Sequence, residues 1–448
     1  MVLEIAAVGG YGEVGRNMTA VRCNGEVVIL DCGIHLPNYV KLTDEETGDV
    51  IKFDEKILRK AGAIPDDRSI ESWWGEVKAI IPSHAHLDHI GAIPYVEHKY
   101  NAPIIATPFA AAVLKTICQN ERIKLRNQVR TLLPNSSLRL TQNITVEFIH
   151  VTHSTPQCVL IVIHTPDGIV CYGNDFKLDN SPTLGRKPNY ESLEALGTKN
   201  VAALILEDLY ANDPRKMPSE GIAKDMLQDV LLGVNSTGKA LVVTTFSSHI
   251  ARLKAIADMG KKLNRKVLFF GRSLAKYAFA AEDAGIAYFS KDGVKIATYG
   301  RQVYQTFKEV EANRDKYMLV MTGHQGEPKA MMFRVLQNQF AFKLKQGDHV
   351  VFSCNVIPAD INKKNRAELE RQLRAVGCRI FTDIHVSGHC AREDLRDVIS
   401  FIKPKHLIPC HGDKPKQEAF TSLAEEMGYS TKAKTLHVLN EGDRVTVN

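Results

Sequence analysis

The sequence predicts an α/β protein in which a region of paired strands is interrupted by a region of alternating helices and strands. Residues 1–207 hold apolar, β-branched runs separated by short turns. From about residue 210, helical segments alternate with buried strands such as "ALVVTT" and "KVLFFG", which is typical of a parallel sheet. After residue 378, strands that end in histidine return. We therefore expect boundaries that give segments 1–207, 208–377 and 378–448, since 448 residues exceed one typical core.

The composition is that of an ordinary globular protein, with 44% apolar and 24% charged residues. The net charge of +6 permits a polyanionic partner without requiring one. The nine cysteines form no CxxC pair, so neither a disulfide framework nor a thiolate zinc site is indicated. There is no signal-peptide pattern at "MVLEIAAVGG" and no apolar run of about 18 residues. We expect a cytoplasmic protein.

The first strand, "LEIAAV", is followed by "GYGEVGRN", in which Gly10, Gly12 and Gly15 match the dinucleotide-binding pattern G-x-G-x-x-G. That function requires a helix to begin at the glycines, so that its N-terminus faces a pyrophosphate. The following "MTAVRCNGEVVILDCG" instead predicts a hairpin that turns at Asn24-Gly25. We therefore favour a tight loop between strands over a nucleotide site.

After a charged insertion at 38–76, the strand in "VKAIIPSHAHLDHIGAIP" ends in a cluster of metal-binding side chains, His84, His86, Asp88 and His89. Side chains two apart can converge on one ion while the next pair turns toward another, so one peptide can supply two sites. The alternative, a polar loop without function, fits a single histidine better than it fits H-x-H-x-D-H.

The rest of the chain continues the same two patterns. Residues 108–130 have a helical pattern whose basic side chains form either a solvated face or a phosphate-facing stripe. The runs "ITVEFIHVTHS", "CVLIVIHTPDGIVCYGNDF" and "VAALILEDLY" predict successive hairpins and hence an antiparallel sheet. The last strands lie in "CRIFTDIHVSGHC" and "KHLIPCHGD".

The H-x-H-x-D-H cluster resembles the signature of the metallo-β-lactamase superfamily, which implies an αββα sandwich. By this resemblance His153 in "HVTHST", Asp175 in "YGNDF" and His411 in "PCHGD" complete two sites, and Asp31 in "ILDCG" is an acid that orients the metal-binding side chains. The oxygen and nitrogen ligands suit two Zn²⁺ ions, and also Mn²⁺. One ion would take His84, His86, His153 and Asp175, and the other Asp88, His89, Asp175 and His411.

The insertion before His411 resembles the β-CASP domain, whose members act on nucleic acids, so segments 1–207 and 378–448 would form one lactamase domain around a β-CASP domain at 208–377. Glu207 in "LILEDLYA" and His389 in "HVSGHC" match motif residues of that group. The segments "TGHQGEP", "VVFSCNVIPADIN" and "HVSGHCAREDL" resemble the ribonuclease J family, particularly its archaeal form, over nearly the whole chain. His324 stands where that family usually has serine.

The resemblance implies a two-metal ribonuclease that degrades single-stranded RNA from a 5′-monophosphate end in the 5′→3′ direction, and a homodimer. His389, oriented by Glu207, would act as general acid. The 5′-phosphate would be bound by His385, Ser387, Gly388 and His389, with Ser353 as a further member. Two alternatives are a β-CASP endonuclease of the RNA 3′-processing type and a non-catalytic RNA-binding scaffold, which would have no need of seven metal-binding residues.

Overall fold

The protein is described here by a computed structural model that covers residues 3–45, 53–298, 300–357 and 360–447. Residues 46–52 of the charged insertion therefore lie outside the described part. The chain folds into two compact units: the first comprises residues 1–180, 186–217 and 388–448, and the second comprises 181–185 and 218–387. The predicted boundaries at residues 207 and 377 refer to the lactamase and β-CASP domains and not to these compact units. They stay predictions.

The first unit contains two sheets that face each other. One has the strand order β19-β1-β2-β3-β4-β5-β6 and the other β18-β11-β10-β9-β8-β7. The strands of the first sheet are β1 Leu3–Gly9, β2 Met18–Cys23, β3 Glu26–Leu30, β4 Val77–Ile81, β5 Ile104–Ala106, β6 Val129–Thr131 and β19 Arg444–Val447. Those of the second are β7 Ser136–Arg139, β8 Thr145–His150, β9 Val159–Thr165, β10 Gly168–Gly173, β11 Val201–Glu207 and β18 His406–Cys410.

The hairpin predicted at Asn24-Gly25 is confirmed. Strands β2 and β3 pair antiparallel with Cys23 opposite Glu26, and both turn residues have positive φ. The preceding "GYGEVGRN" segment leads into a strand and not a helix, as the loop interpretation requires.

The prediction of a purely antiparallel second sheet is wrong in part. Strands β7 to β10 do pair antiparallel, but β11 pairs parallel to β10 and to β18. The reason is that α6 (Tyr190–Leu196) lies between β10 and β11, so the chain crosses over before it re-enters the sheet. The carboxyl ends of β10, β11 and β18 consequently lie at one edge.

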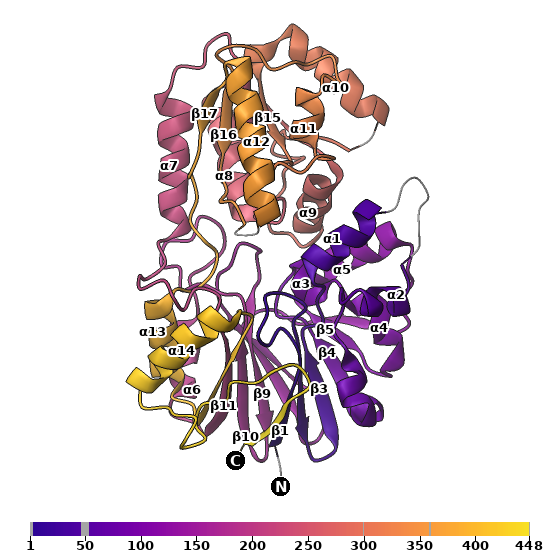
Figure 1. Cartoon of the computed structure of the whole chain (residues 1–448), viewed down its shortest axis with the longest axis vertical. Helices are drawn as coiled ribbons and strands as arrows, with labels where there is room; N and C mark the ends of the chain where they lie inside the picture. The colour runs from indigo at the N-terminus through magenta and orange to yellow at the C-terminus, as the bar shows by residue number, and fades with distance from the viewer. Residues whose placement is uncertain (1–2, 46–52, 299, 358–359, 448) are drawn as a thin grey trace. The chain divides into compact units, whose positions relative to one another are not determined.

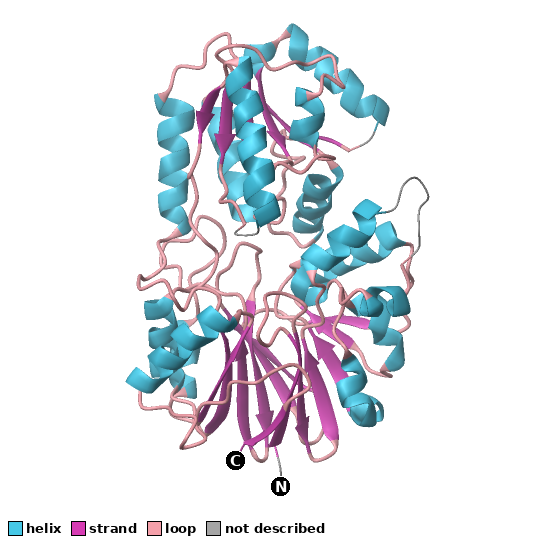
Figure 2. Cartoon of the chain, viewed as in Figure 1, coloured by secondary structure: helices cyan, strands magenta, loops and turns pink. Residues whose placement is uncertain are grey.

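Helices cover both outer faces of the sandwich (Figures 1 and 2). One layer holds α6, α13 (Arg392–Ile402) and α14 (Lys414–Glu426), which pack on the second sheet through Leu193, Leu395 and Phe420. The other layer follows the first sheet. Its helices are α1 Leu36–Glu45, α2 Glu55–Lys60, α3 Leu87–Ile90, α4 Ile93–Val96 and α5 Pro108–Glu121. It also contains the 3-10 helices η1 Asp67–Glu76 and η2 Glu97–Lys99. The predicted αββα sandwich is confirmed.

The helix predicted over 108–130 is shorter than expected. It ends at Glu121 because Arg122 adopts a left-handed conformation, and residues 129–131 join the sheet as β6.

The insertion is fixed to the sandwich by a buried acid. Asp67 accepts two hydrogen bonds of 2.8 Å from Lys99 Nζ, pairs with Arg59 at 2.7 Å and accepts a further bond from the Tyr100 hydroxyl. Trp73 of η1 is buried under Arg22 and Arg444, whose guanidinium carbons lie 5.3 and 4.2 Å from its ring centre. The insertion is thus packed on the sandwich around Asp67 and Trp73.

The second unit is a parallel sheet with the strand order β14-β13-β15-β12-β16-β17, as the alternating pattern predicted. Figure 1 shows its helices along the sheet. The strands are β12 Leu241–Thr244, β13 Lys266–Phe270, β14 Lys295–Ala297, β15 Tyr317–Met321, β16 His349–Phe352 and β17 Arg379–Phe381; the helices are α7 Glu220–Gly233, α8 Ile250–Lys262, α9 Arg272–Asp283, α10 Gly300–Ala312, η3 Arg314–Lys316, α11 Met331–Leu336 and α12 Asp360–Val376. Among the helices of the described residues, none combines the length and apolar character needed to cross a membrane.

Candidate metal centre

The predicted ligands sit where strands of the first unit end. His84, His86, Asp88 and His89 follow β4, and His153 follows β8. Asp175 and His411 follow β10 and β18. Because these strand ends lie at one edge of the sandwich, residues more than 300 positions apart in the chain converge.

The structure brings the seven residues together as two groups that share Asp175. In the first group the nitrogen atoms of His84, His86 and His153 converge: Nε2 of His84 and Nε2 of His153 lie 3.0 and 3.1 Å from Nδ1 of His86. In each group the candidate ligand atoms all lie within 4.8 Å of one another. The groups are His84, His86, His153 and Asp175, and Asp88, His89, Asp175 and His411.

Asp175 lies between the two groups, and its carboxylate oxygens face histidines of both. Its Oδ2 is 3.6 Å from His84 Nε2 and 3.2 Å from His89 Nε2, and its Oδ1 is 3.2 Å from His411 Nε2. Burial alone would raise the pKa of this carboxyl group, but the surrounding imidazoles, His411 first, hold it well below the usual value. The carboxylate is therefore ionised and able to bridge two cations.

Asp31 lies behind the predicted ligands and contacts one of them, His89. Its Oδ2 accepts hydrogen bonds from His89 Nδ1 at 2.7 Å and from the Tyr172 hydroxyl at 2.8 Å, and its Oδ1 accepts one from the Ser83 backbone at 2.6 Å. This leaves His89 Nε2 directed at Asp175. Asp31 thus occupies the position of a carboxylate that fixes the tautomer of a ligand histidine.

Asn17 is a contact residue that the sequence did not single out. Its Oδ1 accepts a bond of 2.9 Å from His411 Nδ1, and its Nδ2 lies 3.2 Å from His89 Nε2. It is the last residue of "GYGEVGRN", and Gly15 N of the same segment lies 3.3 Å from His411 Nδ1. The only signal in the sequence was a glycine-rich loop after a strand. The segment that matches a dinucleotide-binding pattern contacts a predicted ligand histidine instead.

The first group carries little positive charge of its own. Burial, with smaller contributions from neighbouring imidazoles, lowers the pKa of His84 and His153 well below the ordinary histidine value, and burial lowers that of His86 to about 4. Neutral imidazole is the form that binds metal ions. In the second group, burial alone would lower the pKa of His89, but the carboxylates of Asp31, Asp175 and Asp88 raise it well above the ordinary histidine value.

These features fit divalent cations. Three neutral imidazoles cannot satisfy each other's converging nitrogen atoms, because each neutral ring has one donor and one acceptor. Within the described residues, the buried Oδ1 of Asp175 accepts no hydrogen bond. A nitrogen and carboxylate set of this kind is typical of zinc, and it also suits manganese.

His389 lies beside this cluster, paired with Glu207 at the end of β11. His389 Nδ1 donates to Glu207 Oε2 at 2.9 Å, while Oε1 of the same carboxylate accepts from the Phe176 backbone at 2.9 Å. Burial would lower the pKa of His389, but the carboxylates of Asp175 and Glu207 raise it to about 9. Glu207 is fully buried, so its carboxylate is fixed in place.

The residues predicted to bind a 5′-phosphate are divided between the units. Gly388 and His389 belong to the first, whereas His385, Ser387 and Ser353 belong to the second. The Gly388 carbonyl accepts a bond of 2.7 Å from His153 Nδ1. Ser353 is fully buried, and its hydroxyl donates to the Ile384 carbonyl at 3.0 Å. The pocket itself stays a prediction.

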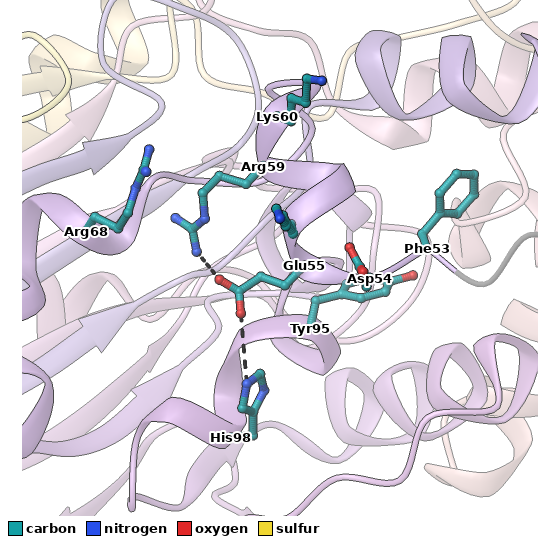
Figure 3. Close-up of a pocket in the computed structure, with 9 residues that line it drawn as sticks. Phe53, Asp54, Glu55, Arg59, Lys60, Arg68, Tyr95 and His98 are labelled. Carbon is teal, nitrogen blue, oxygen red and sulfur yellow. Dashed lines mark hydrogen bonds and ion pairs between the residues drawn. The ribbon is translucent and has the colours of Figure 1, made fainter.

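A separate hollow of about 990 Å³ lies on the insertion (Figure 3). Glu55 lies at its centre between Arg59 and His98, with Glu55 Oε2 3.9 Å from His98 Nε2. Its lining contains none of the predicted site residues: it is formed by Phe53, Asp54, Glu55, Lys56, Arg59, Lys60, Arg68, Tyr95 and His98.

Three known protein families match successive parts of the chain. Residues 68–186 match a beta-lactamase superfamily domain, 238–368 the beta-CASP domain of ribonuclease J, and 374–435 a Zn-dependent metallo-hydrolase RNA specificity domain. A solved protein of unknown function from Enterococcus faecalis shares the fold over the full length of both chains, with a TM-score of 0.67 at 17% identity.

Fold and site together define a metal-dependent hydrolase of the metallo-β-lactamase fold with an inserted β-CASP domain. The chain is 43% identical to ribonuclease J of Methanocaldococcus jannaschii (99% of this chain, 98% of the relative) and 40% identical to that of Pyrococcus abyssi (96% and 94%). It belongs to the ribonuclease J family. Ribonuclease J 1 of Streptococcus pyogenes is 29% identical over 98% of this chain and 73% of its own length.

Proposed function

We propose that this protein hydrolyses RNA phosphodiesters, mainly as a 5′→3′ exoribonuclease on 5′-monophosphate RNA. The observation that carries the proposal is the pair of ligand groups that share Asp175, with His389 3.6 Å from the same carboxylate. The name ribonuclease J of the two archaeal relatives and the RNA specificity domain support RNA as the substrate.

Two Zn²⁺ ions per chain, or Mn²⁺ in their place, would be held by the two ligand groups. When bound, such ions lower the pKa of a water molecule and offset the charge of the phosphate oxygens. The chain itself contributes neutral imidazoles in the first group and the ionised Asp175 between the groups. Asp31 and Asn17 hold the ligand rings in orientation.

His389 is the residue that we propose as proton donor. Hydrolysis frees a 3′-oxygen, and an alkoxide leaves readily only when a proton reaches it. The hydrogen bond from Nδ1 to Glu207 favours the protonated ring and turns Nε2 away from Glu207. Glu207 acts through His389, so it is a positioning residue.

A 5′-monophosphate would be recognised by backbone N–H groups, a hydroxyl and an imidazole from His385, Ser387, Gly388 and His389. A terminal phosphate carries more charge than an internal one, so these donors would bind it preferentially. Binding of the first phosphate would place the first phosphodiester for hydrolysis, which gives the 5′→3′ direction. We also propose a homodimer and a cytoplasmic location.

The test compares three RNAs of equal sequence: linear with a 5′-monophosphate, linear with a 5′-hydroxyl, and circular. We expect release of mononucleotides from the first at the highest rate. His385→Ala should reduce the preference for 5′-monophosphate RNA, whereas His98→Ala, which alters a histidine outside both ligand groups, should not. Equal cleavage of circular and 5′-monophosphate RNA would favour an endonuclease of the RNA 3′-processing type. RNA binding without hydrolysis by the metal-loaded protein would favour a scaffold.

A further inference from the structure

Arg252 of α8 is fully buried in the second unit and joins several elements of it. Its guanidinium forms two hydrogen bonds with the Glu220 carboxylate, from Nε to Oε1 at 2.6 Å and from Nη2 to Oε2 at 2.7 Å. The remaining nitrogen, Nη1, donates to Ser353 O at 3.0 Å, to Ser353 Oγ at 2.9 Å and to Ile384 O at 3.1 Å. The guanidinium therefore links the start of α7 to two loops.

The Ile384 carbonyl accepts two hydrogen bonds. Besides Arg252 Nη1, the Ser353 hydroxyl donates to it at 3.0 Å. Ile384 directly precedes His385, and Ser387 follows two residues later. Both bonds therefore fix the peptide from which the predicted phosphate-binding segment begins.

This network lies where parallel sheets commonly bind ligands. Thr245 and Ser353 directly follow the neighbouring strands β12 and β16. The chain leaves β12 through α8 toward β13 on one side, and leaves β16 through α12 toward β17 on the other. Adjacent strands whose connections depart in opposite directions form a crevice at their carboxyl ends, which is the usual ligand position in open α/β sheets.

We propose that Arg252 and Ser353 are positioning residues for 5′-phosphate recognition, because together they hold the Ile384 carbonyl and thereby orient His385 and Ser387. The inference rests on the proposed exonuclease function and deepens it. It assigns a different role to Ser353, whose buried hydroxyl is engaged with Arg252 and Ile384 and acts on the phosphate only through them.

The network contains a matched control. The Thr245 hydroxyl donates to the Ser353 carbonyl at 2.8 Å, and that carbonyl also receives Arg252 Nη1. Ser353→Ala and Thr245→Val each remove a buried hydroxyl donor from a carbonyl that keeps its bond to Arg252. Only Ser353→Ala affects Ile384.

The experiment measures kcat/KM of the metal-loaded enzyme for 5′-monophosphate and 5′-hydroxyl RNA, with thermal unfolding as the check of folding. We expect Ser353→Ala to lower the ratio of the two values by about 2- to 10-fold, through a higher KM for 5′-monophosphate RNA, since the Ile384 carbonyl loses one of its two hydrogen bonds. Thr245→Val should keep the wild-type ratio. Arg252→Lys should lower the ratio at least as much as Ser353→Ala, because lysine cannot reproduce the guanidinium fork.

A purely structural role predicts another result. It would lower the melting temperature of both hydroxyl variants and leave the ratio unchanged, or change it equally in both; either outcome overturns the inference while the exonuclease function stands. A wild-type enzyme without any preference for 5′-monophosphate RNA would overturn the exonuclease function and this inference together.

Discussion

Replacing Glu207 with glutamine tests the proton-donor role of His389 most directly. The amide keeps an oxygen that can accept from the Phe176 backbone, so the local fold should persist. The other carboxylate oxygen, 2.9 Å from His389 Nδ1, is exchanged for an NH₂ group that cannot accept that hydrogen. His389 then loses the carboxylate that accepts its Nδ1 hydrogen, and with it its fixed tautomer, while the charge of Asp175 stays 3.6 Å away.

The size of the effect follows from the single bond that is lost. A hydrogen bond to a charged group contributes about 1.5–3 kcal/mol, which corresponds to roughly a 10- to 150-fold lower kcat if it is lost at the transition state. Removal of the donor in His389→Ala should cost more, about 100- to 10,000-fold. The double variant should be no slower than His389→Ala alone, because Glu207 acts only through His389.

The assay is single-turnover cleavage of end-labelled RNA by saturating enzyme, with metal content measured on the same samples. Asp208→Asn is the matched control, since it makes the same exchange one residue further along and should keep the wild-type rate. A substrate whose scissile 3′-oxygen is replaced by sulfur should be much less sensitive to both variants, because a thiolate leaves without a proton. Loss of metal from Glu207→Gln, or additive effects in the double variant, would refute the assignment.

Three further predictions concern single acidic or histidine residues. Asp175→Ala and His84→Ala should each lower the bound metal below about two ions per chain and abolish hydrolysis with an unchanged circular dichroism spectrum; full turnover in metal-depleted Asp175→Ala would contradict the two-metal site. Burial raises the pKa of Asp208 to about 8, so between the unfolded value of about 3.9 and this value the folded state holds a proton that the unfolded state lacks. The stability that this group contributes is complete below about pH 4 and is lost as the pH rises toward 8. The melting temperature of Asp208→Asn relative to wild type should therefore be higher at pH 8 than at pH 5. An equal difference at both pH values would contradict this. Asp67→Asn should lower the free energy of unfolding by about 3 kcal/mol in chemical denaturation, while Asp54→Asn at the exposed start of α2 should not; equal stability of both would contradict the anchoring role.

The paired strands of the first region and the parallel sheet of the second could be predicted because both depend on local patterns, whereas the αββα sandwich was implied by the resemblance of the histidine cluster to the metallo-β-lactamase superfamily. Alternation of apolar residues, an Asn-Gly turn and buried runs between helices are readable within short windows. Two features of the fold could not be predicted from such windows. The parallel pairing of β11 depends on where the chain returns after α6, and the end of α5 depends on one residue, Arg122, in a left-handed conformation.

The candidate metal site also has a part that could be predicted from the sequence and a part that could not. His84, His86, Asp88 and His89 are close in the sequence, so their convergence could be inferred from spacing. Asn17 and Ser83 carry no chemical signature that marks them as contacts of ligands. Their role follows from the packing of strands distant in the sequence, and hydrogen-bond partners of that kind are visible only in three dimensions.

Backbone conformation explains why three of the site residues could not be placed by local preference. Asp31, Asp175 and His411 all have left-handed φ values, of 58°, 57° and 67°, within two residues of the ends of their strands. Such conformations cost about 1–3 kcal/mol for residues other than glycine and persist only where the surroundings enforce them. Here the enforcing contacts are the functional ones: Asp31 is held by His89, Ser83 and Tyr172, and His411 by Asn17. A glycine would relieve the strain at any of the three positions but would remove the side chain, so the strained backbone is the conformation that turns each side chain out of its strand and into the centre.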